Sequence, residues 1–365
     1  MNKLNILLID HSEEVCDNVK NLLETNDAVK EIHTTTSLVK GLQMLEHVAV
    51  DIVILDVTIS NHNEPAIRSI LNIRVLPIIV LAAPSVDQTA KTVVAMSQGA
   101  IDFIKKVDFK EEKEAIQFTR NLVMKMQHVN SANRLRSVAR KVKETPLQET
   151  PDVEKHSVQI VEAIPTPHKN KDILVVIGTS TGGPRALHQV IQQIPKGFNH
   201  PILIVQHMPA GFTQSLAERL NNIGNIHVKE AEQGEIIQKG IAYVAPGNYH
   251  MQVKRYRSDF KIELTTEPSH LPHRPSVDFL FQSVARLQNV HIIAAVLTGM
   301  GRDGADGVTA IKQNEKEAII LTESKETSVI DGMPRAVFET NDVTQVLRIE
   351  KIGSAIAAYT KKRGT

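Results

Sequence analysis

The chain has 365 residues, more than one ordinary hydrophobic core holds, so we expect two domains. Its 42 basic and 41 acidic side chains leave a formal net charge of +1, which argues against nucleic acid or a membrane surface as the main partner. The 42% hydrophobic and 23% charged residues are typical of a globular chain and exclude a disordered one.

Residues 1–126 alternate apolar strand candidates with amphipathic segments, the pattern of a parallel sheet with crossover helices. Almost fully apolar runs predict four strands: Leu4–Asp10, Ile52–Asp56, Ile78–Ala82 and the shorter Ala100–Lys105. Helical spacing of apolar residues predicts a helix through Val15, Val19, Leu22 and Leu23, and a last helix from Glu111 to Met126. The first domain is therefore predicted to be α/β, with a parallel sheet.

Residues 127–170 differ in composition from the segments on either side. A basic run comes first, with weak helical periodicity: Arg134, Arg136, Arg140, Lys141 and Lys143. We interpret this run as a solvated extension of the preceding helix, ahead of the alternative that it binds an acidic partner. Prolines among Glu, Thr and Lys residues follow, which is the composition of a linker.

Residues 171–365 form a second predicted α/β unit. Its strand candidates are Ile173–Gly178, Ile202–Gln206, Val290–Gly299 and Ala318–Thr322. The segments Gly240–Pro246 and Met251–Thr265 are predicted to form a hairpin element. We therefore expect a second parallel sheet with a hairpin added to it.

A glycine-rich turn joins the first strand of this unit to a predicted helix and reads Gly178-Thr179-Ser180-Thr181-Gly182-Gly183. Glycines permit a sharp strand-to-helix turn, which would present the Ser180 hydroxyl at the carboxyl end of the sheet. The free N–H groups at the start of the helix could bind an oxyanion there. A phosphate-binding loop, or simply a tight turn, explains this short motif nearly as well.

The ends of two further strands favour a nucleophile turn over these alternatives. His207 follows Gln206, and Asp303 follows the strand candidate that ends at Gly299. A histidine at a strand end is usually structural, and an Asp-Gly pair is usually a turn. Here Ser180, His207 and Asp303 would all lie at one edge of a parallel sheet. A serine nucleophile requires a base, and the base requires a carboxylate to fix its tautomer. The order Ser, His, Asp differs from that of the α/β-hydrolases.

The segments GTSTGGP, QHMP-x-x-F-T, VAPGNYHM, HRPSVD and LTGMGRDG, in this order, resemble the catalytic domain of bacterial chemotaxis protein-glutamate methylesterases from about residue 171 to 360. The resemblance implies hydrolysis of glutamate methyl esters on the cytoplasmic helices of chemoreceptors, with release of methanol. It also implies deamidation of selected receptor glutamines.

By the same resemblance, Ser180 is the nucleophile, His207 the general base and acid, and Asp303 its orienting carboxylate. The backbone N–H of Met300 corresponds to an oxyanion donor, and Thr181 neighbours the nucleophile. Arg274 lies in a segment that resembles the rim of the active-site cleft. Catalysis would need no cofactor, and the histidines show no metal-ligand spacing such as H-E-x-x-H.

The first domain resembles a response-regulator receiver, through Asp10 and Asp56 at strand ends and Lys106 after Phe103. In that family the acids bind Mg²⁺, one aspartate accepts a phosphoryl group from a histidine kinase, and the lysine pairs with that group. Asp56 would be the acceptor, and the resemblance implies a doubly wound sheet of the flavodoxin-like kind. The resemblance thus implies a chemotaxis histidine kinase and Mg²⁺ as partners of this domain.

Several positions depart from the receiver pattern. His11 stands where a second acid is usual, which removes one carboxylate from the cation site, and Ala82 replaces the usual Ser or Thr. The turn after Asp56, residues 58–64, lacks the family motif, and Val107 replaces a proline. Glu13 or Glu14 could supply the missing carboxylate, although neither has the matching position. We hypothesise a degenerate receiver that is phosphorylated poorly or not at all, with a divergent but working receiver as the alternative.

Two other functions are open at this stage. A non-catalytic signalling scaffold is supported by the departures in the receiver and opposed by the complete Ser180, His207 and Asp303 set. A nucleotide-binding module would use the turn from Gly178 to Gly183, but it lacks an acid at the end of the next strand. In the family the receiver covers the catalytic edge, so relief of inhibition would here come from phosphorylation or from another partner.

The sequence also bears on the compartment. No apolar run approaches the roughly 18 residues of a membrane-spanning helix, so we expect no membrane insertion. Met1 is followed within a few residues by the acidic segment Asp10–Glu14, and we expect no secretory leader. The single cysteine, Cys16, has no partner for an internal disulfide, as is typical of a reducing compartment. We therefore predict a cytoplasmic protein.

Overall fold

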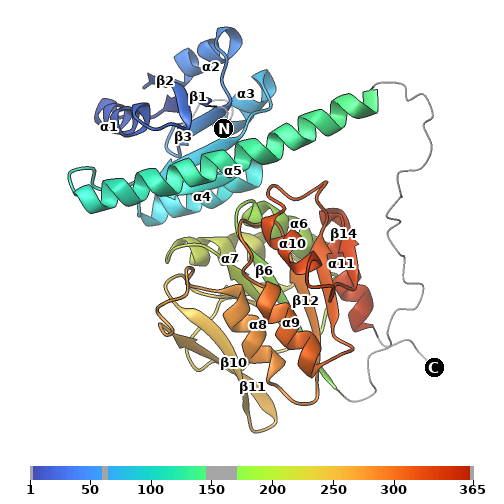
Figure 1. Cartoon of the computed structure of the whole chain (residues 1–365). Coiled ribbons are helices and arrows are strands. Elements are labelled where there is room, and N and C mark those ends of the chain that lie inside the picture. Colours follow the sequence, from blue (N-terminus) through green and yellow to red (C-terminus); the bar gives the residue numbers. More distant parts are fainter. Residues whose placement is uncertain (1–2, 60–64, 145–170, 362–365) are drawn as a thin grey trace. The chain divides into compact units, whose positions relative to one another are not determined.

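A computed structural model describes residues 3–59, 65–144 and 171–361. The chain divides into two compact units, with the boundary in the sequence between Asn133 and Arg134. Each unit is an α/β fold built on its own parallel sheet (Figure 1). The proline-containing part of the expected linker, residues 145–170, lies outside the described residues.

The first unit has a five-stranded parallel sheet in the order β2-β1-β3-β4-β5. Its strands are β1 (Leu4–Ile9), β2 (Val29–Thr35), β3 (Ile52–Asp56), β4 (Ile78–Ala82) and β5 (Asp102–Lys105). Its helices are α1 (Glu13–Glu24), α2 (Leu38–His47), α3 (Ala66–Ile73), α4 (Val86–Gln98) and α5 (Glu112–Glu144). This strand order is that of the flavodoxin-like doubly wound fold, as predicted, and it places the ligand-binding crevice between the carboxyl ends of β1 and β3.

Two features of the first unit differ from the expectation. The strand β2 was not expected, because an edge strand with exposed polar residues, here Lys30 and Glu31, lacks the continuous apolar run of the inner strands. The last helix does not end at Met126 but continues as α5 to Glu144. The first part of the segment expected to be a linker is therefore helical, in agreement with the interpretation of its basic run as a helix extension.

The second unit has a seven-stranded parallel sheet in the order β14-β13-β12-β6-β7-β9-β8 and a separate antiparallel hairpin, β10-β11. Its strands are β6 (Asp172–Thr179), β7 (Ile202–Gln206), β8 (His227–Glu230), β9 (Ile241–Val244), β10 (His250–Tyr256), β11 (Asp259–Thr265), β12 (Val290–Val296), β13 (Ile319–Glu323) and β14 (Gln345–Leu347). Its helices are α6 (Gly183–Gln193), α7 (Phe212–Ile223), α8 (Val277–Ala285), α9 (Ala305–Asn314), α10 (Gly332–Phe338) and α11 (Ile349–Thr360).

Helices cover both faces of this sheet. On one face, α8 and α9 lie side by side and share a buried core with the hairpin and with alternate residues of the strands, such as Leu174 and Val176 (Figure 1). The helices α6, α7 and α11 form a second contiguous group. Because both faces are covered, the inner strands are almost continuously apolar, which made them recognisable in the sequence.

One predicted element of the second unit was placed wrongly. The segment Gly240–Pro246 was expected to belong to the hairpin, but it contains β9, which pairs in parallel with both β7 and β8. Its residues Ala242, Tyr243 and Val244 are fully buried, as expected for an inner strand of a covered sheet. The hairpin itself consists of β10 and β11 alone.

The chain changes direction at the centre of this sheet. From β6 it proceeds to β7 and the outer strands β8 and β9, and it then returns to the other side of β6 through β12 and β13. Parallel sheets bind ligands outside the carboxyl ends of the strands at such a switch point. The loops after β6, β7 and β12 therefore surround the expected site.

Candidate active site

Ser180 directly follows β6, in the turn that leads to α6. Its backbone N–H donates to the carbonyl of Thr298 at 3.0 Å, and its own carbonyl accepts from Gly183 at 2.8 Å. Gly182 has φ = 81°, a left-handed conformation that favours glycine. A Cβ atom on Gly183 would lie 2.0 Å from the Gln206 side-chain oxygen, so only glycine fits. The two glycines thus hold Ser180 in a sharp turn, half-buried at the sheet edge.

His207 lies beside Ser180 because β6 and β7 are paired in register. Thr179 and Gln206 are partners in this ladder, so the two residues that follow them, Ser180 and His207, emerge together from neighbouring strands. The His207 backbone N–H continues the ladder by donating to Thr179 at 3.1 Å. Its ring lies with Nε2 2.7 Å from Oδ2 of Asp303. The structure therefore brings His207 and Asp303 into contact, as the sequence predicted.

The protonation of the ring follows from these contacts. An ionised carboxylate only accepts hydrogen bonds, so the contact with Asp303 places a proton on Nε2 of His207 and leaves Nδ1 with its lone pair. The side chain is 7% exposed, and Nδ1 is buried without a hydrogen-bond partner among the described residues. Nδ1 of His207 thus keeps its lone pair in a loop next to that of Ser180, but among the described residues it makes no hydrogen bond to the Ser180 hydroxyl.

Asp303 is held by several donors besides His207. Its Oδ1 accepts from the Ser276 hydroxyl at 3.0 Å and from the Asp278 backbone N–H at 2.7 Å, and its Oδ2 accepts from the Val277 N–H at 2.8 Å. Burial alone would raise the pKa of Asp303, but these donors and His207 hold that pKa well below its ordinary value. The start of α8 therefore keeps this carboxylate ionised and in place.

Gln206 connects the nucleophile loop with the base, a role that the sequence did not indicate. Its side-chain nitrogen donates to the carbonyl of Ser180 at 2.9 Å and to the carbonyl of His207 at 3.1 Å. The residue is 2% exposed. A lone glutamine at a strand end gives no signal of such a bridge, because the two carbonyls come from separate segments.

The loop after β12 lies against the nucleophile turn. The Thr298 hydroxyl donates to the carbonyl of Thr181 at 2.9 Å, and a Cβ atom on Gly299 would lie 2.9 Å from Cβ of Ser180. Met300 comes next, and its backbone N–H makes no hydrogen bond within the described part of the chain. An unpaired N–H one residue beyond this contact fits the oxyanion donor that the resemblance implies.

The segment before α8 adds a second imidazole. The ring of His273 stacks on that of His207, with centroids 4.1 Å apart and an angle of 20° between the planes. Arg274, expected at the rim of the cleft, is half-buried, and its backbone carbonyl accepts from the Asn248 N–H at 3.3 Å. No hydrogen bond joins Arg274 to the Ser180, His207 and Asp303 side chains among the residues described. The histidine before it is therefore closer to the proposed chemistry than the arginine.

A second carboxylate lies next to Asp303. The side chain of Asp278 accepts from the backbone N–H groups of Gly304 at 2.9 Å and Gly307 at 2.6 Å, at the start of α9. Burial, followed by the charge of Asp303, raises the pKa of Asp278 to about 7. The two helices that flank the site are thus connected through a pair of acidic groups with very different proton affinities.

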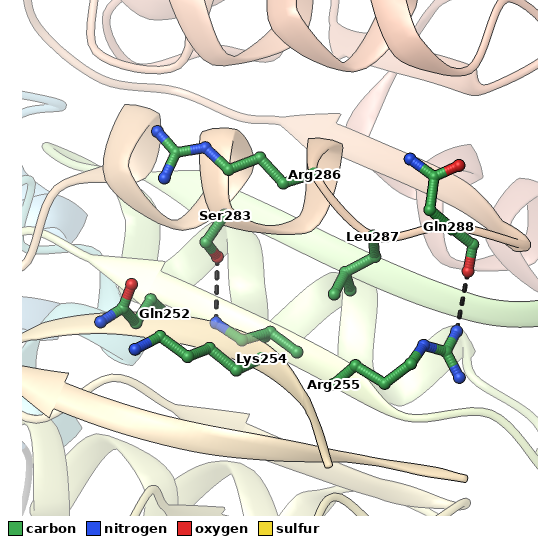
Figure 2. A pocket seen from close by; sticks show the side chains of 8 residues that line it. Gln252, Lys254, Arg255, Ser283, Arg286, Leu287 and Gln288 are labelled. Carbon is green, nitrogen blue, oxygen red and sulfur yellow. Dashed lines mark hydrogen bonds between the residues drawn. The ribbon is translucent and has the colours of Figure 1, made fainter. Parts of the chain in front are cut away.

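A groove of about 400 Å³ lies between β10 and the end of α8, away from the Ser180, His207 and Asp303 set. Figure 2 shows its wall, where Ser283 accepts from the Val253 backbone N–H at 3.0 Å and Arg255 donates to the Gln288 carbonyl at 2.7 Å. Its lining carries basic side chains such as Arg286 but no carboxylate. It contributes no group to the candidate active site.

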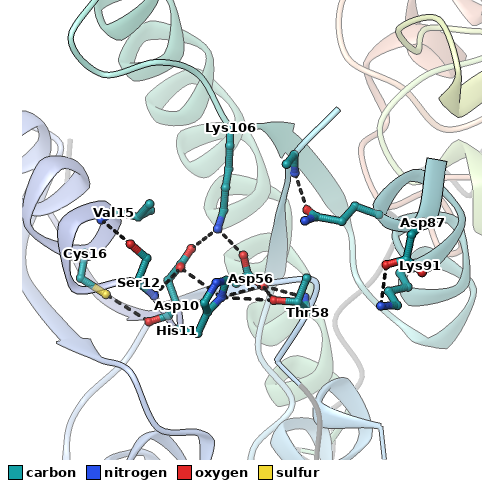
Figure 3. A network of polar contacts seen from close by, with 12 residues as sticks. Asp10, His11, Ser12, Val15, Cys16, Asp56, Thr58, Asp87, Lys91 and Lys106 are labelled. Carbon is teal, nitrogen blue, oxygen red and sulfur yellow. Dashed lines mark hydrogen bonds and ion pairs between the residues drawn. The ribbon is translucent and has the colours of Figure 1, made fainter. Parts of the chain in front are cut away.

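In the first unit, the structure brings together the predicted Asp10, Asp56 and Lys106 (Figure 3). The Lys106 ammonium pairs with Asp10 at 2.6 Å and also with Asp56. Burial would lower the pKa of Lys106, but these two carboxylates raise it. Burial likewise would raise the pKa of Asp56, but Lys106 and Thr58 hold it below its ordinary value. Burial raises the pKa of Asp10.

The third potential ligand at this site is His11, which we considered from the sequence only as the loss of an acid. Asp10, His11 and Asp56 each offer a ligand atom, and these atoms lie within 4.8 Å of one another. Glu13 and Glu14, proposed as substitutes, are exposed in the first turn of α1 and do not join this group. Mg²⁺ prefers a shell made of oxygen atoms, so a donor set with an imidazole does not match the ion that the receiver resemblance implies.

Two further departures from the receiver pattern concern Ala82 and the turn after Asp56. Ala82 is fully buried at the end of β4 and offers no hydroxyl to a phosphoryl group. Residues 60–64 of the divergent turn after Asp56 lie outside the described residues. Within the part of the chain that the structure describes, no helix is long and apolar enough to cross a membrane.

Comparisons with known proteins match both units. Residues 175–356 match the family described as CheB methylesterase, and residues 6–117 match the family described as response regulator receiver domain. The protein-glutamate methylesterase/protein-glutamine glutaminase of Halalkalibacterium halodurans is 34% identical over 361 residues, which cover 99% of this chain and 99% of that protein. The protein of the same description from Clostridium acetobutylicum is 36% identical over 358 residues, covering 98% and 97%.

A solved structure supports the second unit separately. The crystal structure of the Thermotoga maritima CheB methylesterase catalytic domain is 40% identical in sequence, with a TM-score of 0.50. The match covers 52% of this chain and 99% of that structure. The second unit therefore resembles a whole, separately crystallised domain.

Proposed function

The chain belongs to the CheB family of protein-glutamate methylesterases with a receiver domain, and we propose that it hydrolyses glutamate methyl esters on chemoreceptors. The contact of His207 with Asp303, beside the nucleophile turn of Ser180, is the observation that carries this proposal. A non-catalytic scaffold would have no need for a buried imidazole with one nitrogen paired to a carboxylate and the other left basic.

The first half of the proposed reaction forms an acyl-enzyme. The Ser180 hydroxyl oxygen attacks the ester carbonyl carbon while Nδ1 of His207 takes the hydroxyl proton. The resulting oxyanion would accept a hydrogen bond from the Met300 N–H. As the tetrahedral intermediate collapses, the bond from carbon to the methoxy oxygen breaks, and His207 returns its proton to that oxygen. Methanol leaves, and the glutamyl group remains as an ester of Ser180.

The second half hydrolyses this ester. A water molecule attacks the carbonyl carbon as His207 takes one of its protons, and Ser180 leaves with the proton that His207 returns. The product is a free glutamate carboxylate on the receptor. With a glutamine in place of the methyl ester, the same steps release ammonia instead of methanol, so we include deamidation in the proposal.

Asp303 supports both halves without touching the substrate. Its contact with Nε2 fixes the tautomer in which Nδ1 of His207 is basic, and its negative charge stabilises the imidazolium that forms in each half. The donors from Ser276, Val277 and Asp278 hold the carboxylate in position. The mechanism therefore uses only residues of the second unit and no cofactor.

The test is methanol release from methylated chemoreceptor membranes. Ser180→Ala removes the nucleophile, and we expect release to fall to the background measured without enzyme. Ser354→Ala, an exposed serine on α11, is the matched control and is expected to leave the rate unchanged. A Ser180→Ala protein with a wild-type circular dichroism spectrum and a wild-type rate would refute the assignment.

The first unit is proposed to control this reaction in the cytoplasm, with the receptors and a chemotaxis histidine kinase as partners. We propose that its control by phosphorylation is weakened. The support is local: Ala82 has no hydroxyl, and His11 stands where a second acid is usual. Relief of any inhibition would then come mainly from a binding partner.

A further inference from the structure

The site around Asp56 presents three donor atoms to a common point. Nδ1 of His11 lies 3.7 Å from Oδ1 of Asp10 and 3.6 Å from Oδ1 of Asp56 (Figure 3). The three residues come from the ends of the neighbouring strands β1 and β3, so the sheet itself holds the two carboxylates in place. The imidazole therefore points toward the acids rather than away from them.

Lys106 occupies the other side of the two carboxylates. Its ammonium pairs with Oδ2 of Asp10 and Oδ2 of Asp56. Their Oδ1 atoms lie on the His11 side, where they also accept from the backbone N–H groups of Ser12 at 3.0 Å and Thr58 at 2.6 Å. Two carboxyl groups face one ammonium and both acids are fully buried, so the group carries one negative charge when both acids are ionised. A buried net charge is costly, so a cation on the His11 side would be stabilised there.

The distances from His11 to the two carboxylates are compatible with one shared ion. Ligand bonds of about 2.1 Å allow two donors on the same cation to lie up to about 4.2 Å apart. The contacts of 3.6 and 3.7 Å fall within this limit. The His11 side chain is 60% exposed, so an ion can reach the group from solvent without unfolding of the buried acids.

The chemistry of this donor set selects among cations. Mg²⁺ prefers oxygen ligands in near-ideal octahedral geometry, whereas Zn²⁺ and Co²⁺ accept imidazole together with carboxylates. We propose that Asp10, His11 and Asp56 form a site for a divalent transition-metal ion, which this receiver binds in preference to Mg²⁺. The presence of His11 in place of the usual acid thus changes which ion is bound instead of only weakening the site. This inference concerns the first unit and does not depend on the esterase assignment.

The competing explanation is a purely structural histidine. Nδ1 of His11 also lies 3.2 Å from the Thr58 hydroxyl, so a hydrogen bond between these two side chains could account for the ring position. A metal titration distinguishes the two explanations. Only a metal site makes the affinity for a metal depend on whether residue 11 offers a nitrogen or an oxygen atom as donor.

The experiment titrates the metal-free full-length chain with Co²⁺ and, separately, with Mg²⁺ by calorimetry. His11→Asp restores an oxygen donor, His11→Ala removes the donor, and His47→Ala is the control because it deletes an exposed imidazole elsewhere in the same unit. We expect Co²⁺ affinity to fall at least about tenfold in His11→Asp and further in His11→Ala. Mg²⁺ affinity should rise in His11→Asp, and His47→Ala should match the wild type.

A proton NMR measurement tests whether His11 is a ligand without relying on the measured metal affinities. Co²⁺ bound through an imidazole shifts the ring proton resonances of that histidine far outside the normal range of the proton NMR spectrum. The wild type and His47→Ala should show such a shifted ring, and both His11 variants should lack it. An unchanged ratio of Co²⁺ to Mg²⁺ affinity in His11→Asp, or a shifted ring that persists in His11→Ala, would overturn the proposal.

Discussion

At the scale of single residues, His207 is oriented by contacts on three sides. Asp303 pairs with its Nε2 at 2.7 Å, the ring of His273 stacks on it at 4.1 Å, and its backbone continues the ladder with Thr179. These contacts restrict the ring plane and the tautomer before any substrate is bound. Such preorganisation lowers the reorganisation that a proton transfer would otherwise require.

Residues at strand ends were predictable, whereas their supporting contacts were not. Ser180, His207 and Asp303 could be identified because parallel strands end at one edge of a sheet, so positions distant in sequence converge there. The roles of Gln206 and His273 depend on side-chain contacts between separate loops. Such contacts leave no periodic pattern in a single sequence, which is why both residues were missed.

At the scale of elements, α8 and α9 are connected through two neighbouring carboxyl groups. The Asp278 backbone N–H donates to Asp303, while the Asp278 side chain accepts from Gly304 and Gly307 at the start of α9. Asp303 is ionised and Asp278 has a pKa of about 7, so this connection is expected to depend on pH.

The pH dependence of stability has a definite sign. Because the folded-state pKa of Asp278 is raised to about 7 from 3.8, the folded protein binds more protons than the unfolded one between these values. Stability from this group is therefore lost as the pH rises from about 4 to 7. Asp278→Asn keeps an acceptor oxygen without the charge, so it should gain roughly 1–3 kcal/mol relative to the wild type across this range.

The measurement is the free energy of unfolding in denaturant, followed through the transition that abolishes esterase activity. Asp306→Asn, an exposed position on α9, is the control and should show the same pH profile as the wild type. Parallel profiles for Asp278→Asn and the wild type would contradict the account of this carboxyl group.

Buried strands were predicted from the sequence more accurately than exposed ones. Inner strands such as β3 and β7 are apolar on both faces and were identified within a residue of their bounds. The edge strands β2, β8 and β14 were missed because one side of an edge strand is exposed. The edge strand β5, in which three of four residues are buried, was predicted. The segment of β9 was assigned to the hairpin, because an apolar run of four residues does not reveal whether its partner strands are parallel or antiparallel.

At the scale of the whole molecule, the proposed catalytic residues Ser180, His207 and Asp303 share the chain with a receiver domain whose proposed phosphorylation site departs from the family pattern. Both units retain the fold of their families, since the strand orders are those of a doubly wound sheet and of a larger parallel sheet. Among the described residues, the departures His11 and Ala82 are side chains at the carboxyl edge of the first sheet. Whether the receiver still accepts a phosphoryl group therefore depends on local chemistry and not on the fold.

Phosphorylation of the receiver can be measured by intact mass after incubation of the full chain with acetyl phosphate and Mg²⁺. We expect no stoichiometric adduct and an unchanged rate of methanol release, because His11 replaces an acid of the cation site and Ala82 offers no hydroxyl to the phosphoryl group. Asp56→Asn, treated in parallel, identifies any adduct at another residue. A stoichiometric adduct that is present in the wild type and absent from Asp56→Asn would show a working receiver.

The central claim is that Ser180 is the nucleophile and that His207 activates it. The most direct measurement is covalent labelling of the full chain with a fluorophosphonate, which esterifies activated serines with loss of fluoride, followed by peptide mapping. The account predicts one adduct on Ser180, no adduct in Ser180→Ala, and labelling slowed at least 100-fold in His207→Ala, roughly the contribution of a general base. An adduct on another residue, or equal labelling rates with and without His207, would contradict it.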